Sequence, residues 1–177
     1  MLTALAHGAQ SVIPAADIPE ALALRARFPD ALLAGERHGL RIRADLSGGT
    51  DFDLGNSPAE FAPDRVRGRR IVMTTTNGTR ALRACAPARQ VVVGALLNLG
   101  ALVDHLRRLD PPRLLVVCSG TLEQAAFEDA IAAGALCERL LDLYPERAVA
   151  DSVRLAIHAL RPYASDLAAG LAAGRNG

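Results

Sequence analysis

The segment Thr74–Ala81, with the sequence TTTNGTRA, gathers residue types that can bind an anion. It directly follows the apolar run Ile71–Met73, so the pattern predicts a β-strand, a left-handed turn at Asn77-Gly78 and then a helix. Threonine hydroxyls, the guanidinium of Arg80 and free N–H groups at the helix start would meet at the carboxyl edge of a parallel sheet. The alternative is that Thr76 or Asn77 only caps an amphipathic helix. The local sequence leaves both interpretations open.

A second polar cluster lies in the long loop Ser47–Arg70, which is rich in Gly, Pro, Asp and Asn. Long loops in compact domains are usually functional. Within this loop, Asp53 precedes Gly55-Asn56-Ser57-Pro58, a turn that could present a carboxylate, an amide and a hydroxyl together. An ordinary Asx-turn explains the same residues equally well.

Acidic residues occur at two further places, one at a strand end and one at the start of a helix. Glu36 and Arg37 come directly after the apolar run Ala31–Gly35, and they place an acid and a guanidinium at a strand end. Glu128 and Asp129 stand in the first turns of a predicted helix, where one carboxylate could bind Mg²⁺ directly and the other through water. The alternatives are a surface ion pair at the strand end and acids favoured by the helix dipole.

The composition excludes several kinds of chemistry. All 20 basic residues are Arg, and the absence of Lys excludes Schiff-base chemistry and a P-loop lysine. The formal net charge is +1 and aromatic residues make up 3%, so nothing indicates a nucleic-acid partner. The four histidines and three cysteines lack zinc-binding spacing, and no cysteine has the downstream Arg of a cysteine-nucleophile phosphatase. Acids, hydroxyls and Arg together favour Mg²⁺-assisted chemistry on a small anionic substrate.

The sequence favours a reducing, cytoplasmic setting. The cysteines Cys85, Cys118 and Cys137 are odd in number and widely spaced, which gives no disulfide framework. The start MLTALAHGAQ lacks the features of a signal peptide, and no apolar run approaches the ~20 residues of a membrane span. We therefore expect neither export nor a membrane partner.

Short apolar runs alternate with helical patterns along the chain. The runs are typical of buried strands, and they lie at Ser11–Pro14, Ala31–Gly35, Ile71–Thr75, Gln90–Gly94 and Leu114–Ser119. Apolar residues at helical spacing predict helices at Ile18–Phe28, Thr79–Ala86, Leu97–Leu109 and Ala125–Tyr144, and a helical end at Asp151–Ala173 with a break at Pro162. This alternation predicts an α/β fold with a mostly parallel sheet, in a single domain over residues 1–177.

Taken in order, these clusters resemble the 2-phosphosulfolactate phosphatases of the ComB type. The Asp-Leu-Gly-Asn-Ser-Pro and Thr-Thr-Asn-Gly-Thr-Arg segments are the most specific, since neither arises easily from helix or strand periodicity. The resemblance covers nearly the whole chain, through the segments Thr3–Ala9 with the strand end at Pro14, Gly35–Arg37, Phe52–Pro58, Thr74–Ala81, Gly94–Asn98, and Glu128-Asp129 with Ala133-Gly134.

The resemblance implies a three-layer α/β/α fold and a Mg²⁺-dependent acid phosphatase. Its substrate would be (2R)-2-phospho-3-sulfolactate, hydrolysed to (2R)-3-sulfolactate and phosphate in coenzyme M biosynthesis. The residues expected to bind the metal and to act in catalysis are the acids Asp53, Glu128 and Asp129. The residues expected to bind substrate are Glu36, Arg37, Asn56, Ser57, Thr75, Thr76, Asn77, Thr79 and Arg80. Among them we expect Thr75–Arg80 around phosphate and Arg37 toward sulfonate or carboxylate.

The chain departs from the family pattern at both ends. The family's opening strand, which carries a Val-Ile-Asp-Val-Leu-Arg-Ala-like motif, would precede Met1, and a further strand and helix would follow Arg175-Asn176. Loss of a strand would leave unpaired backbone and exposed apolar surface, so we expect poor stability or self-association, as in a homo-oligomer. The alternative to an enzyme is a non-catalytic relative that binds a small phosphorylated or sulfonated acid. In a third interpretation, a structural protein, the polar clusters would be scattered over the surface.

Overall fold

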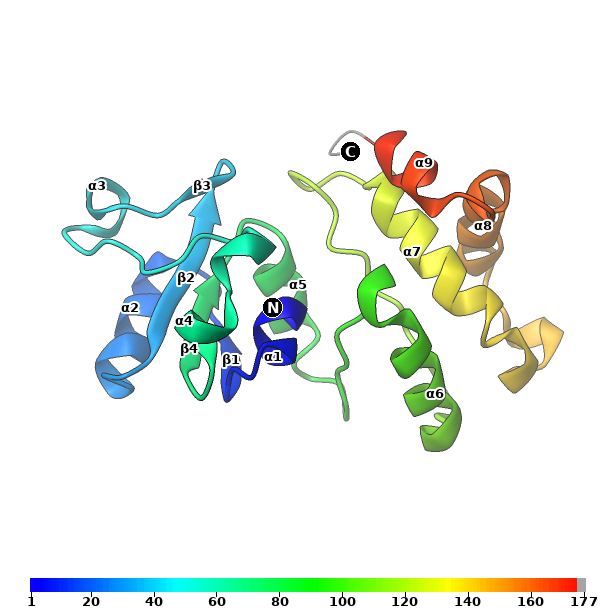
Figure 1. The fold of residues 1–177 in the computed structure, drawn as a ribbon. Coiled ribbons are helices and arrows are strands. Elements are labelled where there is room, and N and C mark those ends of the chain that lie inside the picture. The colour runs from blue at the N-terminus through cyan, green and yellow to red at the C-terminus, as the bar shows by residue number, and fades with distance from the viewer. Residues whose placement is uncertain (175–177) are drawn as a thin grey trace. The chain divides into compact units, whose positions relative to one another are not determined.

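The computed structural model describes residues 1–174 of the chain (Figure 1). The chain forms two compact units, Met1–Val91 and Val92–Gly177, called unit 1 and unit 2 below. The single domain expected from the sequence stays a prediction. The predicted continuation after Arg175-Asn176 falls outside the described residues.

Unit 1 is built on a four-stranded sheet with the strand order β1-β4-β2-β3. The three parallel strands are β1 (Ser11–Pro14), β4 (Arg70–Thr74) and β2 (Leu32–Arg37), and β3 (Leu40–Arg41) pairs antiparallel with β2. Because β4 lies between β1 and β2, Thr74 comes to lie opposite Gly35. This sheet confirms the predicted α/β class and the first three predicted strands.

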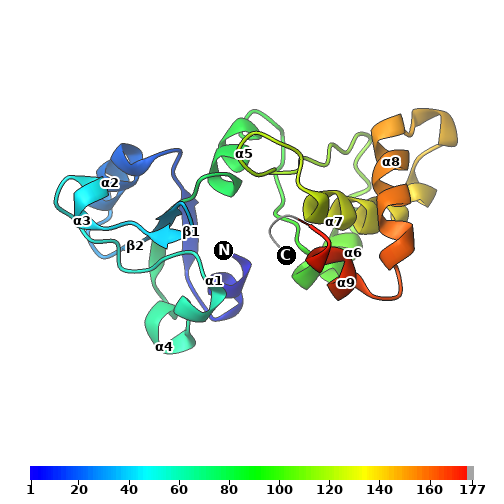
Figure 2. The ribbon, with the colours of Figure 1, turned by 90° about the horizontal axis from the view of Figure 1, so that it is seen from above.

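Helices cover both faces of this sheet (Figure 2). Ile71 and Met73 pack with Ala4 and Val66, from the short helices α1 (Leu2–Ala6) and α4 (Pro63–Val66). Val72 points the other way and packs with residues of α2 (Ile18–Arg27). The alternation along β4 is what a strand buried on both faces requires. Unit 1 therefore has three layers, as expected.

Sequence signals fix the start of α2. The Asp17 side chain accepts a hydrogen bond from the Glu20 N–H at 2.8 Å, and the Glu20 carboxylate accepts from the Ala16 N–H at 2.7 Å. The Asp17 bond satisfies one of the N–H groups that a helix start leaves without partners, and the Ala16 bond holds the residue before the cap against the first turn. The remaining helical segments of unit 1 are α3 (Ala44–Ser47), α5 (Gly78–Ala84) and a single 3₁₀ turn, η1 (Pro58–Glu60).

Unit 2 is helical in its described part. Its helices are α6 (Leu99–Leu109), α7 (Phe127–Glu138), α8 (Asp151–Leu160) and α9 (Leu167–Ala172), with 3₁₀ turns η2 (Leu96–Asn98), η3 (Leu141–Leu143), η4 (Glu146–Ala148) and η5 (Arg161–Tyr163). Leu106, Ile131 and Leu160 belong to one apolar core. The turn at η5 contains Pro162, which confirms the predicted break. None of the described helices is long and apolar enough to cross a membrane.

Two predicted strands are wrong. The apolar runs Gln90–Gly94 and Leu114–Ser119 have no regular secondary structure, and neither forms a strand within residues 1–174. Leu114 and Val116 pack instead against the helical core of unit 2, while Leu115 and Val117 are exposed. Apolar β-branched residues fit a sheet, but a strand also needs a neighbouring backbone to bond with. That partner is not encoded in the run itself.

Gly35 gives a test of how closely β2 and β4 must approach. A Cβ built at this position would lie 2.2 Å from the Thr74 carbonyl oxygen, which is backbone and cannot swing away. We expect Gly35→Ala to lower the free energy of unfolding by about 1–3 kcal/mol, measured by urea denaturation.

Gly100→Ala is the matched control, because nothing lies within 4 Å of a Cβ added at this helical position. It should leave stability unchanged or raise it, by up to about 1 kcal/mol. Equal effects of the two substitutions would contradict the close approach of the strands.

Candidate active site at the carboxyl edge of the sheet

The ends of β2 and β4 bring two predicted clusters together. Glu36 at the end of β2 is 7% exposed, and its carboxylate reaches the segment that follows β4. Its Oε1 accepts a hydrogen bond from the Thr76 N–H at 2.7 Å, and its Oε2 accepts from the Gly39 N–H at 3.0 Å. One side chain thus connects the β4 exit with the turn between β2 and β3. Each oxygen of Glu36 accepts one backbone N–H, so Glu36 positions its neighbours, and its role in binding substrate stays a prediction.

The environment of Glu36 keeps it ionised. Burial acts to raise the pKa of this carboxyl, because desolvation penalises its charged form. The N–H groups of Thr76 and Gly39, the Thr76 hydroxyl and the positive charge of Arg37 act in the opposite direction and outweigh burial. The net result is a pKa below the ordinary value of 4.5. A fixed negative charge is therefore built into the sheet edge.

Arg37 lies beside Glu36 and is held at two points. Its Nη1 donates to the Glu36 backbone carbonyl at 2.6 Å, and its Nη2 donates to the Thr74 hydroxyl at 3.1 Å. Thr74 is fully buried, so this anchor is rigid. The two bonds leave the Nε–H group and one N–H on each terminal nitrogen of Arg37 for an anion. A half-buried, fixed guanidinium suits phosphate, sulfonate or carboxylate oxygens.

Thr75 and Thr79 bind each other across the first turn of α5. The Thr79 Oγ1 accepts from the Thr75 N–H at 2.9 Å and donates to the Thr75 carbonyl at 3.1 Å. The Thr79 N–H donates to the Thr75 Oγ1 at 3.2 Å. The helix cap expected as the alternative is therefore present, although Thr75 makes it, and neither Thr76 nor Asn77 does. Thr79 is almost completely buried, and its hydroxyl proton is already used.

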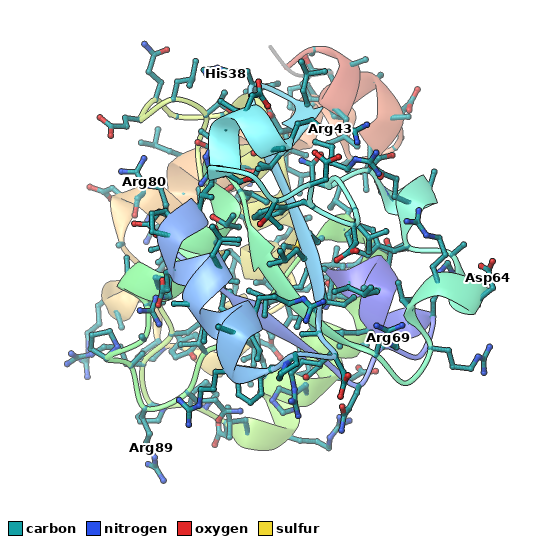
Figure 3. The ribbon with its side chains drawn as sticks, turned by 90° about the vertical axis from the view of Figure 1, so that its left-hand side faces the viewer. His38, Arg43, Asp64, Arg69, Arg80 and Arg89 are labelled. Carbon is teal, nitrogen blue, oxygen red and sulfur yellow. The ribbon has the colours of Figure 1, made fainter. Side chains whose placement is uncertain are left out.

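The turn before α5 differs from the left-handed one expected. Neither Asn77 nor Gly78 has a positive φ, and Gly78 is already the first residue of the helix. The Thr75–Thr79 bonds close the turn within right-handed geometry, so the Asn-Gly pair is not required to reverse the chain. Arg80 is exposed on this helix (Figure 3).

Asp53 lies away from this edge. Its Oδ2 accepts a hydrogen bond from the Leu33 N–H at 2.8 Å, near the amino end of β2. Leu54 pairs with Ala34 in parallel, so the chain then runs toward the carboxyl edge, and Asn56 and Ser57 follow as exposed residues. The segment around Asp53 therefore acts as a short additional strand beside β2. The Asp53 carboxylate thus takes the place of a backbone acceptor for Leu33, the second residue of β2.

Glu128 and Asp129 belong to unit 2, in the first turn of α7. The Asp129 Oδ2 accepts from the Gly120 N–H at 2.8 Å and from the Ser119 hydroxyl at 3.3 Å. The Oε2 atom of Glu128 is buried. It lies beside Gly174, and a Cβ added at Gly174 would be 2.7 Å from this oxygen. Asp129 thus fixes the Ser119-Gly120 segment that precedes α7.

The described residues do not present a preformed metal centre. Within residues 1–174, no three His, Cys, Asp or Glu side chains form a group that could hold a metal ion. Asp53 lies in unit 1, whereas Glu128 and Asp129 lie in unit 2. The three ligands expected from the sequence therefore stay a prediction.

Sequence reasoning missed the residues that hold the site together. Thr74 anchors Arg37, Gly35 permits the contact between the strands, and the Gly39 N–H binds Glu36. His38 and Gly39 both have positive φ, which is the backbone of a two-residue hairpin turn. The His-Gly pair after Arg37 was the available signal for β3. Nothing in the sequence pairs Thr74 with Arg37.

The lowered pKa of Glu36 predicts how stability depends on pH. The folded pKa lies below the unfolded value of 4.5, so ionised Glu36 stabilises the fold above that value, and this contribution disappears as pH falls through the folded pKa. We expect Glu36→Gln to reduce the free energy of unfolding at neutral pH. The difference from wild type should shrink as the sample is acidified below about pH 4.5.

Urea denaturation at several pH values measures this difference. Glu138→Gln, on an exposed position of α7, is the matched control and should be close to wild type throughout. A difference between wild type and Glu36→Gln that stays constant down to acidic pH would contradict the role of the charge.

Comparisons with known proteins agree with the resemblance found in the sequence. The family model described as 2-phosphosulpholactate phosphatase matches residues 1–177. A protein of Caldanaerobacter subterraneus subsp. tengcongensis is 41% identical over 143 residues, which are 80% of this chain and 56% of that protein. A protein of Deinococcus radiodurans is 43% identical over 157 residues, which are 88% of this chain and 62% of that protein. Both bear the name probable 2-phosphosulfolactate phosphatase.

A third protein of that name, from Synechococcus sp. strain JA-3-3Ab, is 45% identical over 139 residues, or 77% of this chain and 54% of that protein. The chain thus spans somewhat more than half the length of these curated relatives. The family match covers every segment on which the resemblance rested, from Thr3–Ala9 to Glu128-Asp129. The chain belongs to the 2-phosphosulfolactate phosphatase family.

Proposed function

We propose that this chain acts in the Mg²⁺-dependent hydrolysis of a small phosphomonoester, (2R)-2-phospho-3-sulfolactate, to (2R)-3-sulfolactate and phosphate. The single observation that carries the proposal is Arg37, a fixed guanidinium at the carboxyl edge of a parallel sheet. Small ligands of open α/β sheets bind at this edge. The names of the relatives supply the substrate.

The contacts suggest a division of labour within unit 1. Arg37 would bind one oxyanion of the substrate, either sulfonate or carboxylate, through its remaining N–H groups. Glu36 would act indirectly, by holding the Thr76 backbone and the β2–β3 turn beside Arg37. Thr75 and Thr79 would keep the start of α5 in place, so that Thr76, Asn77 and Arg80 can approach phosphate.

Magnesium remains part of the proposal. Mg²⁺ usually binds through one or two protein carboxylates together with substrate phosphate oxygens and water, so it does not require a preformed cluster of three acids. When bound, it neutralises phosphate oxygens and activates water. Asp53, Glu128 and Asp129 keep their place as proposed ligands. The three free cysteines support a reducing, cytoplasmic setting for this activity. The reaction itself would be a step in the biosynthesis of coenzyme M.

Phosphate release from 2-phospho-3-sulfolactate tests the function. We expect release with Mg²⁺ and none without it. Arg37→Lys keeps the charge but removes the planar fork, so KM should rise about tenfold or more. Arg89→Gln, an exposed position of unit 1, should leave the kinetics unchanged. A folded wild-type sample that releases no phosphate would favour the non-catalytic relative, which binds a phosphorylated or sulfonated acid without hydrolysing it.

Asp53→Asn separates two roles of that carboxylate. If Asp53 binds the metal, as proposed, the substitution should abolish Mg²⁺-dependent turnover. If it only accepts the Leu33 N–H, the asparagine oxygen can still do so, and turnover per folded molecule should persist. Urea denaturation of the same variant gives the folded fraction. Full turnover by the folded variant would remove Asp53 from the proposed site.

A further inference from the structure

A polar cavity lies at the amino edge of the sheet in unit 1. Its volume is about 470 Å³, and its lining includes Gln10, Arg27, Phe28, Asp30, Arg69 and Arg70. Gln10 precedes β1 and Arg70 begins β4, so the cavity lies at the opposite end of the strands from Glu36 and Arg37. In Figure 3, His38 marks the carboxyl end of β2 and Arg69 lies toward the amino edge. The cavity is thus separate from the candidate active site.

Three arginines, Arg27, Arg69 and Arg70, line this cavity, and Asp30 is the one acidic residue in its lining. The Arg70 guanidinium carbon lies 4.4 Å from the centroid of the Phe28 ring, and that of Arg27 lies 5.5 Å from it. The Arg69 Nη2 donates to the Asp30 backbone carbonyl at 2.9 Å. None of the three arginines takes part in an ion pair within the part of the chain that the structure describes.

Each arginine is anchored, two of them on the same Phe28 ring, and neither anchor neutralises a charge. Phe28 attracts two guanidinium groups through the negative face of its ring, which orients them without removing their N–H donors. Arg27 also stands in the last turn of α2, where the helix dipole favours a cation. The like charges repel one another unless an anion joins them. The cavity therefore combines oriented donors with an excess of positive charge.

We propose that this cavity binds a small polyanion of the diphosphate class. Guanidinium forks match phosphate oxygens, and the donors come from two places, the Arg27–Arg70 pair on Phe28 and Arg69 on the Asp30 carbonyl. A ligand with two linked phosphate groups would place one phosphate on the Arg27–Arg70 pair and the other on Arg69. A single phosphate would bind at one of these places only. The volume lies within the range of small-molecule sites and has room for an organic part beyond the diphosphate.

Isothermal titration calorimetry with inorganic pyrophosphate at physiological ionic strength tests this site. We expect saturable binding of one pyrophosphate, tighter than that of inorganic phosphate. Arg27→Gln and Arg69→Gln should each weaken it by about tenfold, the effect of one lost charge-assisted contact. Tighter binding of a nucleoside diphosphate than of pyrophosphate would identify an organic diphosphate as the ligand, and the reverse order would favour the free anion.

Two control variants keep the result specific. Arg89→Gln removes the same charge from an exposed position of unit 1, apart from Arg69 in Figure 3, and should bind like wild type. Arg37→Lys changes the candidate active site and should also retain binding at the amino edge. Thermal unfolding confirms that each variant folds. No pyrophosphate binding, or an equal loss in Arg89→Gln, overturns the proposal, and a loss confined to Arg37→Lys assigns the binding to the carboxyl edge.

Discussion

The contact between β2 and β4 is the constraint on which the candidate site depends. Gly35 lets the two strands approach until nothing larger than a hydrogen fits between its Cα and the Thr74 carbonyl. That approach lets Glu36 reach the Thr76 N–H and lets Arg37 reach the Thr74 hydroxyl. A wider spacing would break both bonds, because each joins one strand end to the other. The polar site thus depends on the backbone contact between Gly35 and Thr74, one residue before Glu36 in β2.

Glu36 shows how a buried charge is kept in such a place. Burying a carboxylate is unfavourable unless hydrogen bonds replace its water. Each oxygen here receives a backbone N–H, and Arg37 adds a positive charge beside it. The same bonds orient the β2–β3 turn and the β4 exit. Glu36 therefore shapes the candidate site through these bonds, and Arg37, which has N–H groups left over, is the side chain suited to an anion.

Sequence patterns predicted those parts of the fold that depend on local properties. The strands β1, β2 and β4, the helices α2 and α6 and the break at Pro162 follow from apolar periodicity and from proline. The site at the carboxyl edge followed from the parallel sheet, because strand ends share an edge. The two wrong strands, Gln90–Gly94 and Leu114–Ser119, failed because a strand depends on a partner elsewhere in the chain.

Hydrogen-bond partners are the part that residue types could not predict. Asp53, Glu36 and Asp129 are all acids that the motifs singled out, and in each the carboxylate accepts a backbone N–H. Their positions still differ, since Asp53 supports the amino end of β2 and Glu36 lies at its carboxyl end. A motif that contains an acid therefore predicts that a polar group lies at that position. Whether the carboxylate supports the fold or faces a ligand depends on the backbone N–H groups around it. The same holds for the cation Arg37. Its position depends on hydrogen bonds to the Thr74 hydroxyl and to the Glu36 carbonyl of its own strand, which the residue types did not predict.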